Sequence, residues 1–256
     1  MNNNFVCINS GARIGANVEI GPFTTIDDNV EIGDGCHIGS NVTILSGARI
    51  GKNVTIFPGA VISAIPQDLK FRGEDTQAYI GDNTVLRECV TVNRGTAAKG
   101  RTVVGSNCLI MAYSHVAHDC IIGNNVIISN ASQLAGEVEV DDFAVIGGGS
   151  LVHQFCHIGT HVMLQGGALV NKDIPPFVKA AREPISYTGI NTIGLHRRGF
   201  SAEAIACIQD IYRMIYASGL NVTDAVARVE AEVEPSPERN IILSFIRSSQ
   251  RGIIRG

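Results

Sequence analysis

An aliphatic residue recurs at every sixth position over most of the chain, and this repeat limits the fold more than any other feature. From Ile8 to Val170 the series has 28 positions, of which 25 hold Ile, Leu or Val. A series this long with three exceptions predicts a repeat fold rather than separate strands. A small or β-branched residue stands two positions before most of these aliphatic residues. Since alternate residues of a strand share one face, each unit predicts a short strand with two inward side chains and a turn. A glycine often follows the aliphatic residue, as at Gly33 and Gly105, and we expect it to ease the turn.

Two interruptions of the period predict outward loops, near residues 63–78 and 93–101. The repeat ends at "KDIPPF", because two prolines do not suit a paired strand. Helical spacing of apolar residues then predicts helices over 201–218 and 223–233, with a third beginning at Ser236 and Pro237. The sequence thus predicts a strand-repeat domain over residues 1–174 and an α-helical domain over 175–256.

Composition excludes several classes of protein. The net charge is -4 and the hydrophobic fraction is 45%, which predicts a well-buried fold and disfavours nucleic-acid binding. There is no basic leader, and nowhere do eighteen apolar residues run together, so we expect no integral membrane segment. The seven cysteines form no C-x-x-C pair. We therefore expect reduced thiols and a cytoplasmic protein.

The stretch "YSHVAHDC", residues 113–120, places two histidines, an aspartate and a cysteine close together. The six-residue phase directs Ser114, Val116 and Cys120 inward. His115 then points outward, and His118 lies in the following turn. A metal site of His118, Asp119 and Cys120 would need ligands from opposite faces of one strand, so no local metal site is predicted.

The period resembles that of the hexapeptide-repeat acyltransferases, whose left-handed parallel β-helix has three hexapeptides in each coil. The resemblance implies an all-β left-handed parallel β-helix of about nine coils, about 45 Å long at ~4.8 Å per coil, followed by a small α-helical C-terminal domain. Five motifs make the resemblance more specific. They are "QDLK" at 67–70, "HVAHDC" at 115–120, "VHQFC" at 152–156, "DIPPF" at 173–177 and "RRGF" at 197–200. These motifs are similar to those of the UDP-N-acetylglucosamine 3-O-acyltransferases of lipid A biosynthesis.

That family moves an (R)-3-hydroxyacyl group from acyl carrier protein to the 3-hydroxyl of UDP-N-acetylglucosamine. A sugar hydroxyl is a weak nucleophile at neutral pH, so a histidine base suits the reaction. The resemblance gives this role to His118, with Asp119 fixing its tautomer and the backbone N–H of Gly136 binding the oxyanion. It implies no acyl-enzyme, no cofactor and no metal.

The resemblance also assigns the binding residues and a homotrimer. The sugar and its phosphates would be contacted by Gln67, Asp68, Lys70, His115, His153 and Gln154. The uridine diphosphate would meet Asn191, Arg197 and Arg198 of a neighbouring subunit, and Gly166 would gauge the length of the acyl chain. The tail beyond residue 175 carries ten Lys and Arg against eight Asp and Glu, a balance that would suit acidic acyl carrier protein.

The sequence departs from the family pattern in three places. Glu137 and Asn93 stand where histidines are expected, and Thr192 and Ile193 stand where an acidic residue is expected. These departures leave open a 3-amino UDP-sugar as the acceptor. Two other classes also remain open. One is a zinc enzyme similar to gamma-class carbonic anhydrases, which would use outward histidines. The other is a catalytically inactive hexapeptide scaffold.

Overall fold

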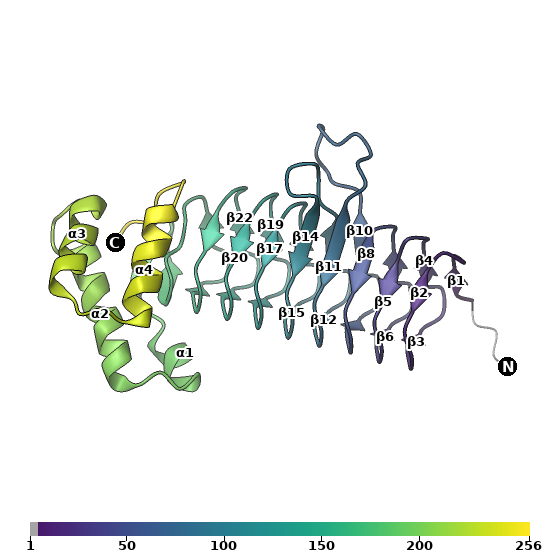
Figure 1. Ribbon diagram of the computed structural model, residues 1–256, viewed down its shortest axis with the longest axis horizontal. Coiled ribbons are helices and arrows are strands. Elements are labelled where there is room, and N and C mark those ends of the chain that lie inside the picture. Colours follow the sequence, from purple (N-terminus) through teal and green to yellow (C-terminus); the bar gives the residue numbers. More distant parts are fainter. Residues whose placement is uncertain (1–4) are drawn as a thin grey trace.

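The chain folds as a three-sided prism of stacked coils with helices at one end, in a computed structural model that describes residues 5–256 (Figure 1). The coils follow one another along the long axis of the prism, and strands from successive coils pair in parallel. Most strands are two residues long, and each contributes to one of three sheets, called here A, B and C. The repeat of short strands expected from the period and the parallel β-helix implied by the resemblance are therefore confirmed.

The strands of each sheet follow its order along the prism. Sheet A contains β1 (Cys7–Ile8), β4 (Thr25–Ile26), β7 (Thr43–Ile44), β10 (Val61–Ala64), β13 (Thr91–Asn93), β16 (His115–Val116), β19 (Gln133–Leu134), β22 (Leu151–Val152) and β25 (Leu169–Val170). Sheet B contains β2 (Arg13–Ile14), β5 (Glu31–Ile32), β8 (Ala48–Ile50), β11 (Gln77–Ile80), β14 (Arg101–Val104), β17 (Ile121–Ile122), β20 (Glu139–Val140) and β23 (His157–Ile158). Sheet C contains β3 (Glu19–Ile20), β6 (His37–Ile38), β9 (Thr55–Ile56), β12 (Val85–Leu86), β15 (Leu109–Ile110), β18 (Ile127–Ile128), β21 (Val145–Ile146), β24 (Met163–Leu164), β26 (Val178–Ala181) and β27 (Ser186–Ile190).

The core of the prism is the aliphatic series itself. From Ile26 onward its Ile, Leu and Val side chains are buried, as are the small residues two positions before them. Only the first coil differs, because no coil covers it on one side, and Ile8 there is 45% exposed. Since each coil buries its apolar residues against its neighbours, stability accumulates along the stack, as in other repeat proteins.

The glycines after the aliphatic residues serve a different purpose from the expected one. A Cβ on Gly33 would lie 2.6 Å from Gly51 O, and one on Gly105 would lie 2.4 Å from Gly123 O. These glycines therefore allow neighbouring coils to approach closely. The left-handed backbone of the turn falls two positions later, where asparagine is frequent, as at Asn29 and Asn53.

Two loops leave the prism where the period breaks, between β10 and β11 and between β13 and β14. Both project from the same region of the prism (Figure 1). We call residues 65–76 the long loop and residues 94–100 the short loop. Both loops lie within the stretches where the period is interrupted. Their roots are tied together, because Thr76 Oγ1 donates to Gly95 O at 2.6 Å.

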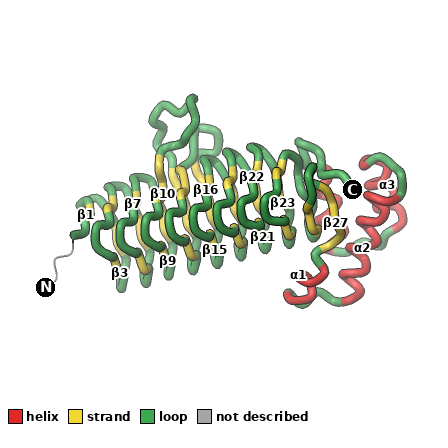
Figure 2. Tube along the Cα trace, turned by 180° about the vertical axis from the view of Figure 1, so that it is seen from behind, coloured by secondary structure: helices red, strands yellow, loops and turns green. Residues whose placement is uncertain are grey.

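Paired strands continue past the double proline. β26 pairs in parallel with β24, and β27 then pairs antiparallel with β26, as Figure 2 shows beside the helices. The prediction that "KDIPPF" ends the strand region was wrong, because the prolines occupy a turn and Val178 resumes the sheet. Residues 175–256 therefore include two strands besides their helices.

Four helices follow, which are α1 (Thr192–Arg197), α2 (Ala202–Ala217), α3 (Val222–Glu232) and α4 (Pro237–Ser248). The last three confirm the predicted helices, and each is capped at its N-terminus by the side chain of Ser201, Asn221 or Ser236. The short helix α1 was not predicted, because six residues are too few for a helical period to show. Tyr212 of α2 is fully buried and donates to Pro176 O at 2.6 Å, which joins the helices to the prism.

Candidate active site

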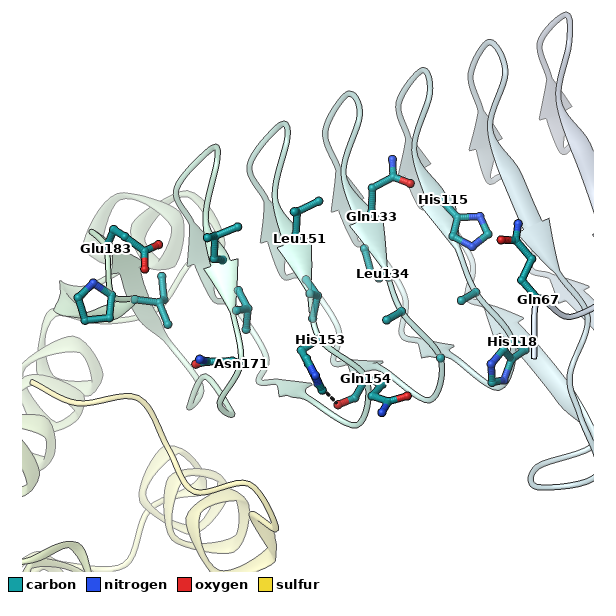
Figure 3. Close-up of a pocket in the computed structure, with 18 residues that line it drawn as sticks. Gln67, His115, His118, Gln133, Leu134, Leu151, His153, Gln154, Asn171 and Glu183 are labelled. Atoms are coloured by element: carbon teal, nitrogen blue, oxygen red, sulfur yellow. Dashed lines mark hydrogen bonds between the residues drawn. The ribbon is translucent and has the colours of Figure 1, made fainter. Parts of the chain in front are cut away.

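A groove of about 660 Å³ runs along the outer side of sheet A (Figure 3). Along the groove lies one ladder of outward side chains from successive coils. In this ladder His115 pairs with Gln133, Gln133 with Leu151, and Leu151 with Leu169. It ends at residues 183–185, before β27. The groove is thus polar at the end near the two loops, whereas its far part combines the apolar Leu151 and Leu169 with the polar Asn171 and Glu183.

His118 and Asp119 form a hydrogen-bonded pair at the polar end of the groove. His118 Nδ1 lies 2.9 Å from Asp119 Oδ2, and the His118 side chain is 18% exposed whereas that of Asp119 is fully buried. An ionised carboxylate only accepts hydrogen bonds, so Nδ1 carries the proton and Nε2 is left as an acceptor. The expected pairing of Asp119 with His118 is therefore present in the fold.

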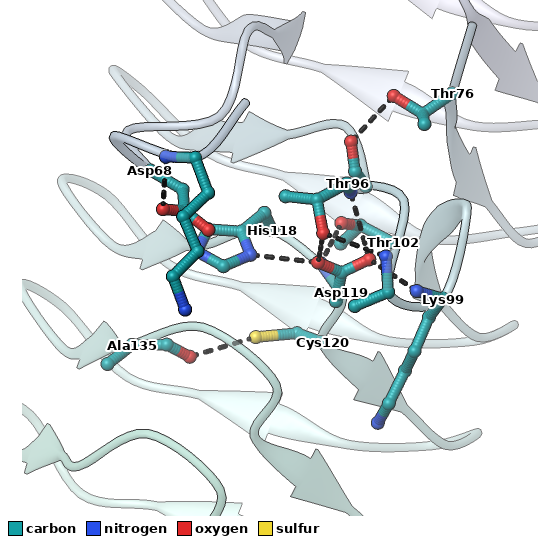
Figure 4. A network of polar contacts seen from close by, with 12 residues as sticks. Asp68, Thr76, Thr96, Lys99, Thr102, His118, Asp119, Cys120 and Ala135 are labelled. Carbon is teal, nitrogen blue, oxygen red and sulfur yellow. Dashed lines mark hydrogen bonds and ion pairs between the residues drawn. The ribbon is translucent and has the colours of Figure 1, made fainter. Parts of the chain in front are cut away.

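The Asp119 carboxylate is held by the short loop (Figure 4). Thr96 contributes its N–H to Oδ1 at 2.9 Å and its hydroxyl to Oδ2 at 2.7 Å, and the N–H of Lys99 also reaches Oδ1. Burial alone would raise the pKa of the Asp119 carboxyl, but the hydrogen bonds from Thr96, His118 and Lys99 together hold that pKa below its ordinary value. The pair is therefore built around a carboxylate ion.

Gly136 lies directly against the imidazole of His118. A Cβ there would be 2.6 Å from both Cε1 and Nε2 of the ring, so any other residue would displace the imidazole. Within the described chain, the Gly136 N–H donates to no other residue. The next residue fixes this segment, because Glu137 N–H donates to His118 O at 3.0 Å. A free backbone donor thus lies beside the histidine, as oxyanion binding requires.

His115 lies in the same groove, 18 residues before Gln133 in the ladder. Its Nδ1 is 2.7 Å from the Thr91 hydroxyl. Burial lowers the pKa of His115, and the nearby His118 lowers it further. The ring is therefore neutral at pH 7 and acts as a hydrogen-bonding group. The sequence did not single out Thr91, whose only signal is its place opposite His115 in the repeat.

Other predicted sugar contacts surround this end of the groove. Gln67, His153 and Gln154 line it, and His153 Nδ1 lies 3.1 Å from Gln154 O. Asp68 and Lys70 belong to the long loop but do not line the groove of the single chain, and Asp68 Oδ1 accepts the N–H of Lys70.

Asn191, Arg197 and Arg198 lie on another side of the prism. They line a second pocket of about 570 Å³ between α1 and the outer side of sheet C, formed there by β18, β21 and β24. Asn191 caps α1 through its side-chain oxygen and donates to His161 O. The Arg198 guanidinium stacks on Phe143, 4.3 Å from the ring centroid. A single chain therefore does not bring these three residues to His118.

Gly166 lies in the exposed turn between β24 and β25, and it does not line the groove of the single chain. A Cβ there would be 3.1 Å from Gly148 O. The two residues that replace the expected histidines can also be located. Asn93 is buried at the root of the long loop and donates to Ile65 O. Glu137 has a left-handed backbone beside Gly136.

Across residues 5–256, no three His, Cys, Asp or Glu side chains lie close enough together to hold a metal ion. None of the helices in the same range has the length and apolar character needed to cross a bilayer. All seven cysteines are unpaired, and Cys36, Cys108, Cys120 and Cys156 are buried in the inward slots of the repeat.

Stacked coils of this period, with a groove at their side, define the bacterial hexapeptide transferases. The model of that family describes six repeats, and it matches residues 11–46, 29–64 and 101–136. Residues 173–254 match a second model, described as domain 2 of UDP N-acetylglucosamine O-acyltransferase. The acyl-[acyl-carrier-protein]–UDP-N-acetylglucosamine O-acyltransferase of Chlorobaculum parvum is 61% identical over 96% of this chain and 93% of its own length. The homologue from Chlorobium phaeobacteroides is 63% identical with the same coverage. The chain belongs to this family of acyltransferases.

Solved structures agree in fold along the full chain. A UDP-N-acetylglucosamine acyltransferase from Bacteroides fragilis is 57% identical, covers all of both chains and superposes with a TM-score of 0.97. One from Francisella novicida is 38% identical, covers 99% of this chain and 94% of its own, and has a TM-score of 0.96. The left-handed winding implied by the resemblance is confirmed by this similarity, together with the helical C-terminal segment.

Proposed function

We propose that this chain transfers an (R)-3-hydroxyacyl group from acyl carrier protein to the 3-hydroxyl of UDP-N-acetylglucosamine, with His118 as the general base. The observation that carries the proposal is the arrangement of His118, Asp119 and Gly136 at the end of the groove that lies near the two loops. His118 Nε2 removes the hydroxyl proton as the oxygen attacks the thioester carbonyl. A C–O bond forms, the C–S bond breaks, and the proton passes from the imidazolium to the departing thiolate.

Each part of the arrangement supplies a separate contribution. General-base catalysis by a histidine is worth about 10²- to 10⁴-fold in rate. Asp119 holds the proton on Nδ1 and stabilises the imidazolium that forms. We assign the oxyanion to the free N–H of Gly136, and the loss of such a donor costs about 2.7–4 kcal/mol in known enzymes.

The groove suits the two substrates in its two parts. Gln67, His115 and Gln154 are polar groups beside His118, where the sugar would lie, and we place Asp68, Lys70 and His153 around the same sugar and its phosphates. Leu151 and Leu169 are about half exposed along the far part of the groove, and an acyl chain would cover them there. Gly166, in the turn before β25, would act on acyl length from the side of the groove.

A homotrimer completes the site in this proposal. The arginine pocket lies on sheet C and the histidine groove on sheet A, so Asn191, Arg197 and Arg198 reach the uridine diphosphate only from a neighbouring subunit. Exposed apolar side chains support such packing, because Leu151, Met163 and Leu169 are 39–49% exposed on these two faces and Leu69 of the long loop is 95% exposed. We place the enzyme in the cytoplasm, where acyl carrier protein would supply the acyl group.

A transfer assay with hydroxyacyl carrier proteins of several chain lengths tests the proposal. We expect UDP-N-acetylglucosamine to be acylated, and His118→Ala to lower kcat by at least about 10²-fold. His37→Ala is the matched control, because His37 is an exposed histidine on β6, away from the groove. Wild-type turnover by His118→Ala would contradict the base assignment. A sedimentation mass near the 27.2 kDa of one chain would contradict the shared site.

A further inference from the structure

The short loop holds the buried Asp119 carboxylate through several hydrogen bonds. Three donors from this loop reach its two oxygens, and His118 Nδ1 is the fourth. Both backbone donors, from Thr96 and Lys99, go to Oδ1. The hydroxyl of Thr96 goes to Oδ2, the same oxygen that accepts from His118. Thr96 thus acts on the oxygen that orients the histidine.

The direction of the Thr96 hydrogen bond is fixed by its neighbours. Thr96 Oγ1 accepts the N–H of Ala98 at 3.1 Å, so its single hydrogen is free to donate to Asp119 Oδ2 at 2.7 Å. Charge-assisted hydrogen bonds of this length are among the stronger ones in proteins. Thr96 is 7% exposed, so water does not readily replace it.

The short loop is itself held rigidly against the prism. Gly95 N–H donates to Gln77 O, and Gly95 O accepts from Thr76 at the end of the long loop. Thr96 O accepts the N–H of Gly100 at 2.7 Å, which closes the loop on itself. On the other side, the Asp119 N–H donates to the Thr102 hydroxyl at 2.8 Å. Figure 4 shows this chain of contacts from Thr76 through Thr96 to Asp119 and His118.

We propose that Thr96 is a positioning residue for the acyl transfer, because its hydroxyl fixes Asp119 Oδ2 where it holds the proton on His118 Nδ1 and directs Nε2 into the groove. The inference rests on the proposed role of His118 as the base. Without the hydroxyl, Oδ2 keeps only the histidine as a partner, and only the two N–H groups on Oδ1 still resist rotation of the carboxylate about its Cβ–Cγ bond. The imidazole then samples the wrong tautomer and orientation for part of the time.

Thr96→Val tests this inference, because valine keeps the shape and the backbone N–H but removes the hydroxyl. A hydrogen bond to a charged group is worth enough to predict a loss of roughly ten- to hundredfold in kcat, with KM for both substrates nearly unchanged. Thr96→Ser restores the hydroxyl and should return kcat to within a few-fold of wild type. Thr96→Ala serves in its place if the valine variant does not fold.

Thr84→Val is the matched control. Thr84 is also a buried threonine whose hydroxyl donates to a carbonyl, Gly105 O, and accepts an N–H, that of Cys108. It is remote from the groove, so its loss should lower thermal stability without lowering kcat. An equal loss of kcat in Thr84→Val and Thr96→Val would show a general structural effect and overturn the inference.

The ring nitrogens of His118 give a readout that does not depend on turnover. With ¹⁵N-labelled histidine, the wild-type ring should show a single tautomer protonated at Nδ1, and Thr96→Val should shift it toward a mixture. Unchanged ring signals together with wild-type kcat would overturn the inference. Changed ring signals with wild-type kcat would support the positioning and contradict His118 as the base instead.

Discussion

Gly136 and His118 are in contact so close that a single methyl group would separate them. A Cβ on Gly136 would lie 2.6 Å from His118 Nε2, well inside van der Waals contact. The two residues come from successive coils, at the turns that follow β16 and β19. The base and the oxyanion donor are therefore set at a fixed separation by the stacking of the prism.

Gly136→Ala should disable the enzyme without unfolding it. The added methyl must displace the His118 ring, because the prism backbone cannot move as easily as a side chain. We expect kcat to fall by about 10²-fold or more, the effect of a misplaced base. Steady-state kinetics and a thermal unfolding curve measure the two effects. Gly11→Ala is the control, since its Cβ would only touch Asp28 at 3.2 Å near the other end of the prism. Full activity of Gly136→Ala would show that the ring does not occupy this place during the reaction.

Phe143→Leu should weaken binding of the nucleotide sugar. The Phe143 ring supports the Arg198 guanidinium at 4.3 Å and is stacked in turn on His161 at 4.8 Å. Leucine fills much of the volume but provides no aromatic face, so Arg198 loses its fixed plane. We expect KM for the UDP-sugar to rise about three- to tenfold, with kcat nearly unchanged. Phe23→Leu, at an exposed ring near the first coil, is the control, and an equal effect there would remove the support for the arginine pocket.

Cys120→Ala should reduce the loss of stability at alkaline pH. Burial raises the pKa of the Cys120 thiol to about 12, from an ordinary value of 9.0. The unfolded chain ionises first, so the thiol contributes stability that is complete below about pH 9 and is lost as the pH rises toward 12. Removing it should lessen the slope of the free energy of unfolding by at most about 1.4 kcal/mol per pH unit in this window. Denaturant unfolding of Cys120→Ala and of the exposed Cys7→Ala gives the comparison. Identical pH slopes for Cys120→Ala and Cys7→Ala would mean that the Cys120 thiol ionises in the folded protein with an ordinary pKa.

Asp141→Asn should loosen α4 most strongly at low pH. His157 Nε2 is 2.8 Å from Asp141 Oδ1, and its ring packs at a tilt against Phe245 of α4, with the ring centroids 4.4 Å apart. Burial opposes the charge on His157, but the hydrogen bond and charge of Asp141, with Glu139 and Asp173 nearby, raise its pKa above 6.5.

The sign of this pH effect follows from the raised pKa. Stability from the pair is complete below about pH 6.5 and is lost as the pH rises through the folded value. Asp141→Asn should therefore lower the melting temperature more at pH 6 than at pH 9, as calorimetry can measure. Asp210→Asn, in an exposed pair with Arg213, should change it little at either pH. A larger effect at pH 9 would contradict a charged His157.

The sequence period predicts the orientation of nearly every residue in the prism, because inward and outward positions alternate with the strand. It correctly separates Ser114, Val116 and Cys120 from His115 and His118. It does not predict what the short loop does, because Thr96 lies outside the repeat and its contact with Asp119 depends on how the loop folds back. It also does not predict the purpose of the coil glycines, which depends on the distance between coils rather than on the turn.

In the C-terminal region, elements that are too short to show a period also escape prediction from the sequence. Amphipathic spacing predicts α2, α3 and α4, since each buries one face over several turns. The hairpin of β26 and β27 and the short α1 have no period long enough to detect. They nevertheless carry the arginine pocket, because α1 places Arg197 and Arg198 over sheet C.

The ladder from His115 to Leu169 means that the length of the groove can change only in steps of one coil. Its four outward side chains come from adjacent strands of sheet A, 18 residues apart in each case. Each added or deleted coil would change the length of the groove by about 4.8 Å. Changes of coil number therefore cannot adjust the groove by a single carbon atom of an acyl chain. Such fine adjustment would have to come from the size of individual residues beside the far part of the groove, such as Leu151, Leu169 and the proposed length-setting Gly166.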